Sequence, residues 1–198
     1  IALTRTTAEL ALRKQREPAE YREALREVLH ESERTTALIE NLLTLARADA
    51  GRAQLDLSRF DLAELLGEVS EQAAKLATVK RQTFQYSPAG QPLPVSADSS
   101  ALRRLFLILL DNAVKYTGEG GSISLVATVH QKRIHVEVRD DGIGIPADDL
   151  PRIFERFYRA DKSRNRDSGG AGLGLSLAKW IAEAHHAELT VESTAGSG

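Results

Sequence analysis

The chain contains no cysteine and no methionine, and its charges are nearly balanced. The lack of cysteine excludes disulfide bonds, zinc–thiolate sites and thiol nucleophiles. The lack of methionine leads us to expect that Ile1 lies inside a longer protein. With 26 Lys and Arg against 28 Asp and Glu, the formal net charge is −2. We therefore expect no nucleic-acid partner, because such proteins usually carry a strong basic excess.

Long apolar runs are also missing. No run approaches the roughly 20 residues that a membrane-spanning helix needs, and no signal peptide is visible. We therefore expect no membrane contact by this chain. Its 198 residues, 42% hydrophobic and 27% charged, suffice for one sizeable core and a smaller second element.

The first part of the chain predicts a helical hairpin. Residues 1–16 and roughly 20–50 read as two helices, with Pro18 near the start of the second. Steps of three and four residues separate the positions of a seam in the second helix: Leu25, Val28, Ser32, Thr35, Ile39, Leu42 and Ala46. One hairpin cannot bury such a seam alone, whereas two copies can form a four-helix bundle. We expect a homodimer through residues 1–51; the alternative is packing against the rest of the same chain.

Gly51 ends the second helix, and residues 52–198 predict an α+β domain with one mixed sheet and helices on one face. Strands are expected within 53–62, 81–87, 122–130, 133–141 and 188–193, helices within 62–77, 99–117, 146–159 and from the glycines to about 186, and a proline-rich loop over 88–98. Residues 122–141 alternate with period two around a short polar turn, which predicts an antiparallel hairpin.

Two groups of polar residues stand at the ends of predicted elements. Asn112, Lys115 and Tyr116 lie on one side of a helix end, where an amide oxygen suits magnesium, a lysine suits phosphate and a tyrosine ring can cover a base. Asp140 ends a strand and precedes Gly142 and Gly144 in "DDGIGIP", so its carboxylate could accept a hydrogen bond from an adenine amine. A solvated helix end and a plain Asp-Gly turn are the alternatives.

A basic segment and a glycine cluster follow. Residues 151–167 hold six Lys or Arg against three Asp or Glu, and we expect Phe154 and Phe157 to anchor the start of this segment in apolar surface. The stretch "SGGAGLGLSLAKW", residues 168–180, then runs from glycines directly into a helix. A helix N-terminus offers free N–H groups and a positive dipole end, and glycines let a phosphate approach the backbone. The alternative is a linker before a helix.

The four motifs in this order resemble the catalytic, ATP-binding domain of sensor histidine kinases. "DNAVKYT" resembles the N box of that family, "DDGIGIP" its G1 box, "FERFYR" its F box and "GGAGLGL" its G2 box. Residues 1–51 resemble its dimerisation and histidine-phosphotransfer domain. The resemblance implies the Bergerat-type α/β sandwich that gyrase, Hsp90 and MutL share with histidine kinases.

The resemblance also implies roles. Asn112 would hold Mg²⁺, Lys115 and Arg159 would reach phosphates of ATP, and Asp140 would accept the adenine amine. The implied nucleotide-binding set is Asn112, Lys115, Tyr116, Asp140, Gly142, Gly144, Ile145, Phe157, Arg159, Gly170, Gly172, Leu173, Gly174 and Leu175. Asn112, Lys115 and Arg159 would be the catalytic residues. We expect residues 161–169 to form a lid that is mobile without nucleotide and ordered with it.

Three departures from the family pattern stand out. Ile108 occupies the place of a common second Asn, Ala171 replaces a common Thr, and the His-Glu-Leu-Arg-Thr-Pro run of the H box is expected to end just before Ile1. The acceptor His is then expected upstream, so that this chain binds ATP without phosphorylating itself. The phosphoryl group would pass on to an Asp of a response regulator.

The parent protein is expected to be a membrane-anchored bacterial sensor, with this chain in its cytoplasmic portion. Two alternatives remain. One is an ATPase of the same superfamily, although Ile108 stands where those enzymes carry a water-activating Glu. The other is an ATP-binding dimerisation module without kinase activity.

Overall fold

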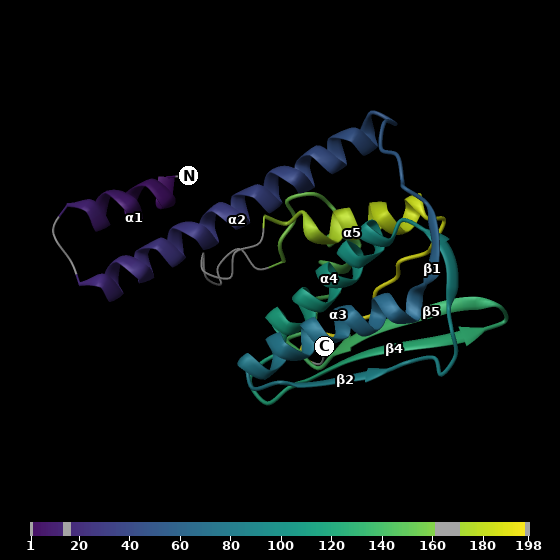
Figure 1. The fold of residues 1–198 in the computed structure, drawn as a ribbon. Coiled ribbons are helices and arrows are strands. Elements are labelled where there is room, and N and C mark those ends of the chain that lie inside the picture. Colours follow the sequence, from purple (N-terminus) through teal and green to yellow (C-terminus); the bar gives the residue numbers. More distant parts are fainter. Residues whose placement is uncertain (1, 14–16, 161–170, 197–198) are drawn as a thin grey trace. The chain divides into compact units, whose positions relative to one another are not determined.

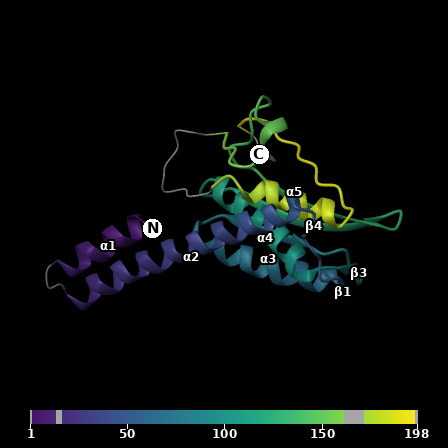
Figure 2. The same ribbon diagram turned by 90° about the horizontal axis from the view of Figure 1, so that it is seen from above.

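The computed structural model describes residues 2–13, 17–160 and 171–196. The chain divides into two compact units, residues 1–51 and 52–198. In the first unit, helix α1 (Ala2–Leu12) lies beside helix α2 (Pro18–Asp49), as Figures 1 and 2 show. Pro18 occupies the first turn of α2, where its missing N–H costs nothing, and the Glu17 N–H donates to Glu20 Oε2 at 3.1 Å. The predicted hairpin is confirmed, although α1 ends at Leu12 rather than at residue 16.

The predicted seam of α2 divides between two stripes. Val28 and Thr35 are partly buried, on the same side of α2 as Tyr21 and Ala24, whereas the seam residues Leu42 and Ala46 are exposed. A second stripe, at steps of four and three, is exposed: Leu25, Leu29, Ser32, Thr36, Ile39 and Leu43. We call it the outer stripe of α2. The seam residues Leu25, Ser32 and Ile39 therefore belong to this exposed side.

The strands of the second unit form two sheets rather than the single predicted sheet. Strand β1 (Ser58–Asp61) pairs antiparallel with β3 (Pro94–Ala97). The larger sheet has the order β2-β4-β5. In it β2 (Thr83–Ser87) runs parallel to β4 (Ser122–His130), and β4 runs antiparallel to β5 (Arg133–Asp140). This sheet is mixed, as predicted.

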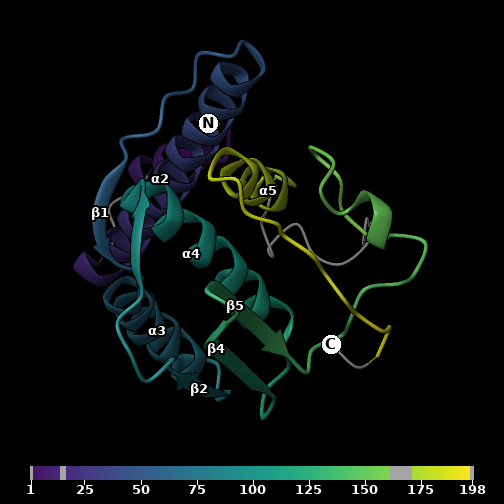
Figure 3. The same cartoon turned by 90° about the vertical axis from the view of Figure 1, so that its right-hand side faces the viewer.

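Three helices build the core on this sheet. They are α3 (Leu62–Val79), α4 (Ser99–Tyr116) and α5 (Gly174–Ala184). Helix α3 packs against β2, α4 against β5, and α5 against α4 (Figures 1 and 3). Leu66, Leu125 and Leu177 are fully buried. Asp98 caps α4 by accepting the Ala101 N–H at 3.0 Å, which satisfies a donor that the first turn leaves free. Helices thus cover one sheet face, as predicted.

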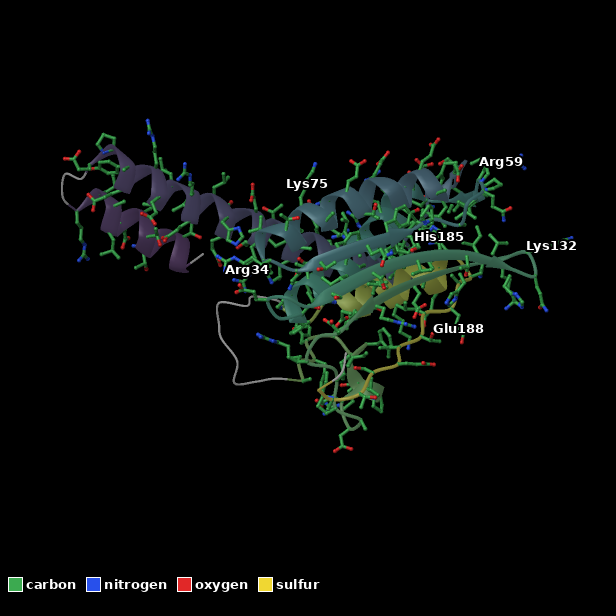
Figure 4. All side chains as sticks on the ribbon, turned by 90° about the horizontal axis from the view of Figure 1, so that it is seen from below. Arg34, Arg59, Lys75, Lys132, His185 and Glu188 are labelled. Atoms are coloured by element: carbon green, nitrogen blue, oxygen red, sulfur yellow. The ribbon has the colours of Figure 1, made fainter. Side chains whose placement is uncertain are left out.

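The β4–β5 hairpin turns through two non-glycine residues. Gln131 and Lys132 both have positive φ, 49° and 68°, the combination that two-residue hairpin turns require. Figure 4 shows Lys132 at the tip. The predicted antiparallel hairpin is confirmed.

Three further predictions are wrong. The proline-rich loop contains β3, which Pro94 can begin because a strand tolerates a missing N–H at its first residue. The helix expected within 146–159 is only the short 3₁₀ helix η1 (Leu150–Arg152). Residues 187–193 form no strand (Figure 3). Among the described residues, no helix combines the length and the apolar character that a bilayer crossing requires.

Candidate nucleotide-binding site

The end of α4 presents Asn112, Lys115 and Tyr116 together. Ala113 and Val114 are buried in the core, so the residues beside them on the helix turn towards its open side. Asn112 and Lys115 are partly buried, and Tyr116 is 42% exposed. The Lys115 Nζ lies 5.0 Å from the centroid of the Tyr116 ring. The structure therefore brings a cation, an amide and an aromatic ring to one helix end.

Asp140 is the last residue of β5, and its carboxylate is partly buried. Its Oδ1 accepts the Gly142 N–H at 3.0 Å. Burial raises the pKa of Asp140, the Gly142 hydrogen bond lowers it and the charge of Asp141 raises it; the net direction is upward. Asp141 is exposed and serves the sheet instead, since its Oδ1 accepts the Ser122 N–H at 2.8 Å. Of these two neighbouring carboxylates, Asp140 is the partly buried one, so a hydrogen bond from a ligand to Asp140 would compete less with water.

Gly142 allows the Asp140 turn to touch the end of α4. A Cβ at Gly142 would lie 2.6 Å from the Tyr116 carbonyl oxygen and 2.7 Å from Asp140 Oδ1. No side chain fits at such distances. The neighbouring Ile143 N–H donates to the same Tyr116 oxygen at 3.3 Å. This close approach places Asp140 beside the helix end that carries Tyr116.

The C-terminal segment crosses the same turn. Gly144 has φ +66°, and a Cβ there would lie 2.0 Å from the Thr194 carbonyl oxygen. The Ile145 N–H donates to Ser193 Oγ at 2.8 Å, and the Gly196 N–H donates to the Ile143 carbonyl oxygen at 2.8 Å. These bonds explain why the expected strand over 188–193 is absent, because the end of the segment meets the Asp-Gly-Ile-Gly turn instead of continuing along a sheet edge.

The start of the basic segment is anchored differently from the prediction. Ile153 is buried and Phe154 is partly buried, with Lys179 Nζ 5.3 Å from the Phe154 ring centroid. Phe157 is 63% exposed, so it does not anchor the segment in this structure. Its φ of +63° is an unusual conformation for a non-glycine residue. Arg159 is exposed.

The glycine cluster leads into α5 through a tight contact. Gly172 has φ +70°, and its carbonyl oxygen accepts the Phe157 N–H at 2.8 Å. Leu173 is 2% exposed and its carbonyl oxygen accepts the Ser176 hydroxyl at 2.9 Å, while Leu175 is partly buried. Gly170 and the expected lid, 161–169, lie outside the described residues.

Ile108 meets the start of α5. Its Cγ2 would lie 3.2 Å from a Cβ at Gly174, so the aliphatic side chain fills the contact between the two helices. Ile108 therefore makes an apolar contact between α4 and α5 at the position where the family commonly has an Asn.

The described donors fit a nucleotide with a magnesium ion held mostly by phosphates. Among the described residues, no cluster of three His, Asp or Glu side chains forms a metal cage. Mg²⁺ in phosphate-transfer sites often needs only one or two protein ligands in addition to phosphate oxygens and water. The Asn112 amide supplies a hard oxygen at the helix end, and Gly142 lets the turn after Asp140 pack closely against that helix end.

Sequence reasoning missed several contacts that tie the ends of α4 to distant parts of the second unit. Asp98 donates its N–H to His185 Nε2 at 3.0 Å, and His185 Nδ1 lies 2.8 Å from the Ile181 carbonyl oxygen; Figure 4 labels His185. The start of α4 is therefore tied to the end of α5. Asp98 Oδ2 also accepts the Asp56 N–H at 3.1 Å. Burial acts to raise the pKa of Asp98, but the hydrogen bonds that it accepts outweigh burial and lower it. Gln82 and Ser193 are the other missed residues, because their partners are distant in the sequence.

Comparison with known proteins agrees with this geometry. Residues 97–198 match the histidine kinase-, DNA gyrase B- and HSP90-like ATPase family, and residues 1–51 match the His Kinase A (phospho-acceptor) domain. The sensor histidine kinase YkoH of Bacillus subtilis is 38% identical over 92% of this chain, which spans 39% of YkoH.

Solved structures share the fold. ShkA in complex with AMPPNP superposes with a TM-score of 0.70 at 28% identity, over 92% of this chain and 40% of ShkA. ThkA in complex with the response regulator TrrA gives 0.68 at 21% identity, over 94% of this chain and 51% of that chain. The chain belongs to the histidine kinase-, DNA gyrase B- and HSP90-like ATPase family, as a sensor histidine kinase core, which confirms the resemblance of its four motifs.

Proposed function

We propose that this chain is the ATP-dependent kinase core of a two-component sensor. In the whole protein, the γ-phosphoryl group of ATP would pass to a His and then to an Asp of a response regulator. The observation that carries the proposal is the contact between Asp140 and the end of α4. It places a partly buried carboxylate, which can accept a hydrogen bond from the adenine amine, next to Tyr116.

The proposed residue roles are those that the resemblance to the family implies, and each suits the chemistry of its group. Asp140 accepts the adenine amine, and the Tyr116 ring lies by the base. Lys115 pairs with phosphate, and Arg159 reaches the terminal phosphate from the segment before the glycines. Ile145, after the Asp140 turn, and Phe157, before the glycine cluster, would line the nucleotide pocket. Gly142, Gly144, Gly170, Gly172 and Gly174, with Leu173 and Leu175, shape the backbone around the nucleotide.

Asn112 would hold Mg²⁺, which neutralises phosphate charge when bound. Phosphoryl transfer asks little covalent chemistry of a protein, since positioning and charge stabilisation supply most of the catalysis. The chain offers these through Asn112, Lys115 and Arg159. An ATPase mechanism with a general base at residue 108 does not fit, because an aliphatic side chain cannot take a proton and Ile108 packs at the start of α5.

The partners follow from the first unit and the family. The His Kinase A match implies dimerisation, and we propose that residues 1–51 form a homodimeric four-helix bundle through the outer stripe of α2. A receiver domain is the proposed acceptor partner; ThkA, which shares the fold, is solved with such a regulator. The curated relatives are longer sensor kinases, of which the chain spans 39%, and we propose that the whole protein is a membrane-anchored sensor with this chain in its cytoplasmic portion.

Isothermal titration calorimetry of the chain with ADP, and with a non-hydrolysable ATP analogue in the presence and absence of Mg²⁺, tests the proposal. We expect binding of both, and tighter binding of the analogue with Mg²⁺. Guanine nucleotides should bind more weakly, since guanine offers no exocyclic amine at the corresponding position. A folded chain that binds no adenine nucleotide contradicts the proposed function.

A further inference from the structure

Gln82 lies between α3 and β2 and reaches the end of α4. Its side chain is 8% exposed. Its Nε2 donates to two backbone oxygens, that of Val114 at 3.0 Å and that of Thr117 at 2.6 Å. An α-helix leaves its last carbonyls without intrahelical partners, and this amide supplies a donor to two carbonyl oxygens at that end.

The bonded carbonyls flank the functional side chains. Val114 precedes Lys115 and Tyr116, and Thr117 follows them. The carbonyl between, that of Tyr116, accepts the Ile143 N–H of the Asp140 turn. The last turn of α4 is thus held from two sides, by Gln82 and by the turn that carries the proposed adenine acceptor.

The Gln82 side chain also has an unfavourable feature. Gln82 Oε1 is buried without a hydrogen-bond partner among the described residues, as is the Thr117 hydroxyl. A buried unpaired acceptor is unfavourable, so the contribution of Gln82 lies in its two donors rather than in its acceptor. Lys80 Nζ also donates to the Val114 oxygen, at 3.0 Å, but the Thr117 oxygen receives its side-chain bond from Gln82.

We propose that Gln82 is a positioning residue of the nucleotide site. It fixes the last turn of α4 so that Asn112, Lys115 and Tyr116 face the nucleotide in register with Asp140. This inference rests on the proposed nucleotide binding and adds a residue that does not itself touch the ligand.

The test is the variant Gln82→Glu, titrated with ADP by calorimetry between about pH 7.5 and pH 5.5. An ionised carboxylate has no donor and would face two carbonyl oxygens, so we expect about tenfold weaker binding than wild type at the upper pH. Burial and the carbonyl oxygens favour the protonated acid, which can donate one bond. The ratio of variant to wild-type dissociation constants should therefore shrink as the pH falls. The neighbouring charges are Lys80, Arg81 and Glu119, which line the same surface recess and are identical in both proteins.

Gln85→Glu is the matched control, because Gln85 is exposed on the next strand; it should bind ADP like wild type at every pH. Should Gln82→Glu fail to fold, Gln82→Met removes the donors without adding charge and should still weaken ADP severalfold. Wild-type ADP affinity in a folded Gln82→Glu or Gln82→Met chain, or a ratio for Gln82→Glu that does not change with pH, overturns the positioning role. Absence of binding by the wild type would instead reject the proposed function.

Discussion

The Phe157 N–H donates a 2.8 Å hydrogen bond to the Gly172 carbonyl oxygen, and both residues adopt positive φ. The bond joins the F box to the G2 box, and 14 residues lie between Phe157 and Gly172 in the sequence. It links the segment that follows η1 to the segment that precedes α5. The residues on either side of the proposed lid are therefore hydrogen-bonded to each other.

Replacing Gly172 by alanine should damage this junction. A Cβ there would lie 2.7 Å from the Phe157 carbonyl carbon and 2.8 Å from the Tyr158 carbonyl oxygen, at φ +70°. The left-handed conformation alone costs about 1–2 kcal/mol for a non-glycine residue. We expect a lower melting temperature and weaker nucleotide binding. Gly67→Ala is the control: it lies in α3, where an added methyl group would meet open space, and should leave both values unchanged or raise stability. A Gly172→Ala chain as stable as wild type contradicts the prediction.

Asp140→Asn should weaken adenine nucleotides while stabilising the free chain. An amide has only one acceptor oxygen, can present its NH₂ donor to the adenine amine, and lacks the charge that favours the bond. At neutral pH, however, the buried charge of Asp140 opposes folding, as its raised pKa indicates, and the amide removes that cost. Calorimetry and thermal melts measure the two effects. Asp141→Asn, at the exposed neighbour, should leave adenine affinity unchanged; equal losses in both variants would count against the assignment.

The raised pKa of Asp140 also fixes the sign of two pH effects. A carboxyl group that binds its proton more tightly in the folded chain makes folding more favourable as the pH falls through the interval above its ordinary value of about 3.9. Nucleotide affinity should change in the opposite direction, because protonation removes the acceptor for the adenine amine. We expect ADP binding by wild type to weaken on acidification through that interval, and Asp140→Asn to lose this dependence.

The outer stripe of α2 should mediate dimerisation. Leu25 is 66% and Ile39 49% exposed, and unpaired apolar stripes of this spacing are typical of helical bundles. Ile39→Glu should shift sedimentation towards the monomer. Ala37→Glu introduces the same residue at an exposed position on another side of the helix and should leave the dimer intact. A wild-type chain that stays monomeric at high concentration would show that the stripe serves another contact.

The 198-residue chain should not label itself with γ-labelled ATP. His185 is bonded to the Asp98 N–H, His186 follows it at the end of α5, and His130 and His135 lie in the β4–β5 hairpin. His30 is exposed on α2 of the first unit, but we propose that the acceptor is another His, in the H box that we expect upstream of Ile1. A longer form that includes the H box should become labelled. Acid-labile label on residues 1–198 that disappears in His30→Ala would identify His30 as an acceptor after all.

Elements with strong local signals could be predicted from the sequence. Helix α4 has both an apolar period and the Asp98 cap, and its motif residues follow from that helix. Strand β3 could not be found in this way, because its prolines indicate a loop and its stability depends on pairing with β1, far away in the chain. The alternation over 188–193 predicted a strand, but Ser193 and Gly196 bond to the Asp140 turn instead.

The supporting residues of the site lie beyond sequence reasoning for the same reason. Gln82 bonds carbonyl groups 32 and 35 residues away, and a glutamine before a strand has no signal of its own. The bonding partner of Asp98, His185, is 87 residues distant. The four motifs can be recognised in the sequence by their residues and their order. The residues that support them, such as Gln82, can be identified only from contacts in the folded chain.

The hydrogen bond from the Asp56 N–H to Asp98 has a practical consequence for dissecting the molecule. Residues 52–57 belong to no helix or strand, so a boundary drawn from secondary structure would fall at Ser58. Such a cut would keep every strand and helix of the second unit and remove one of the donors that steady the cap of α4. A separate catalytic piece should therefore begin at Arg52, where the compact unit begins.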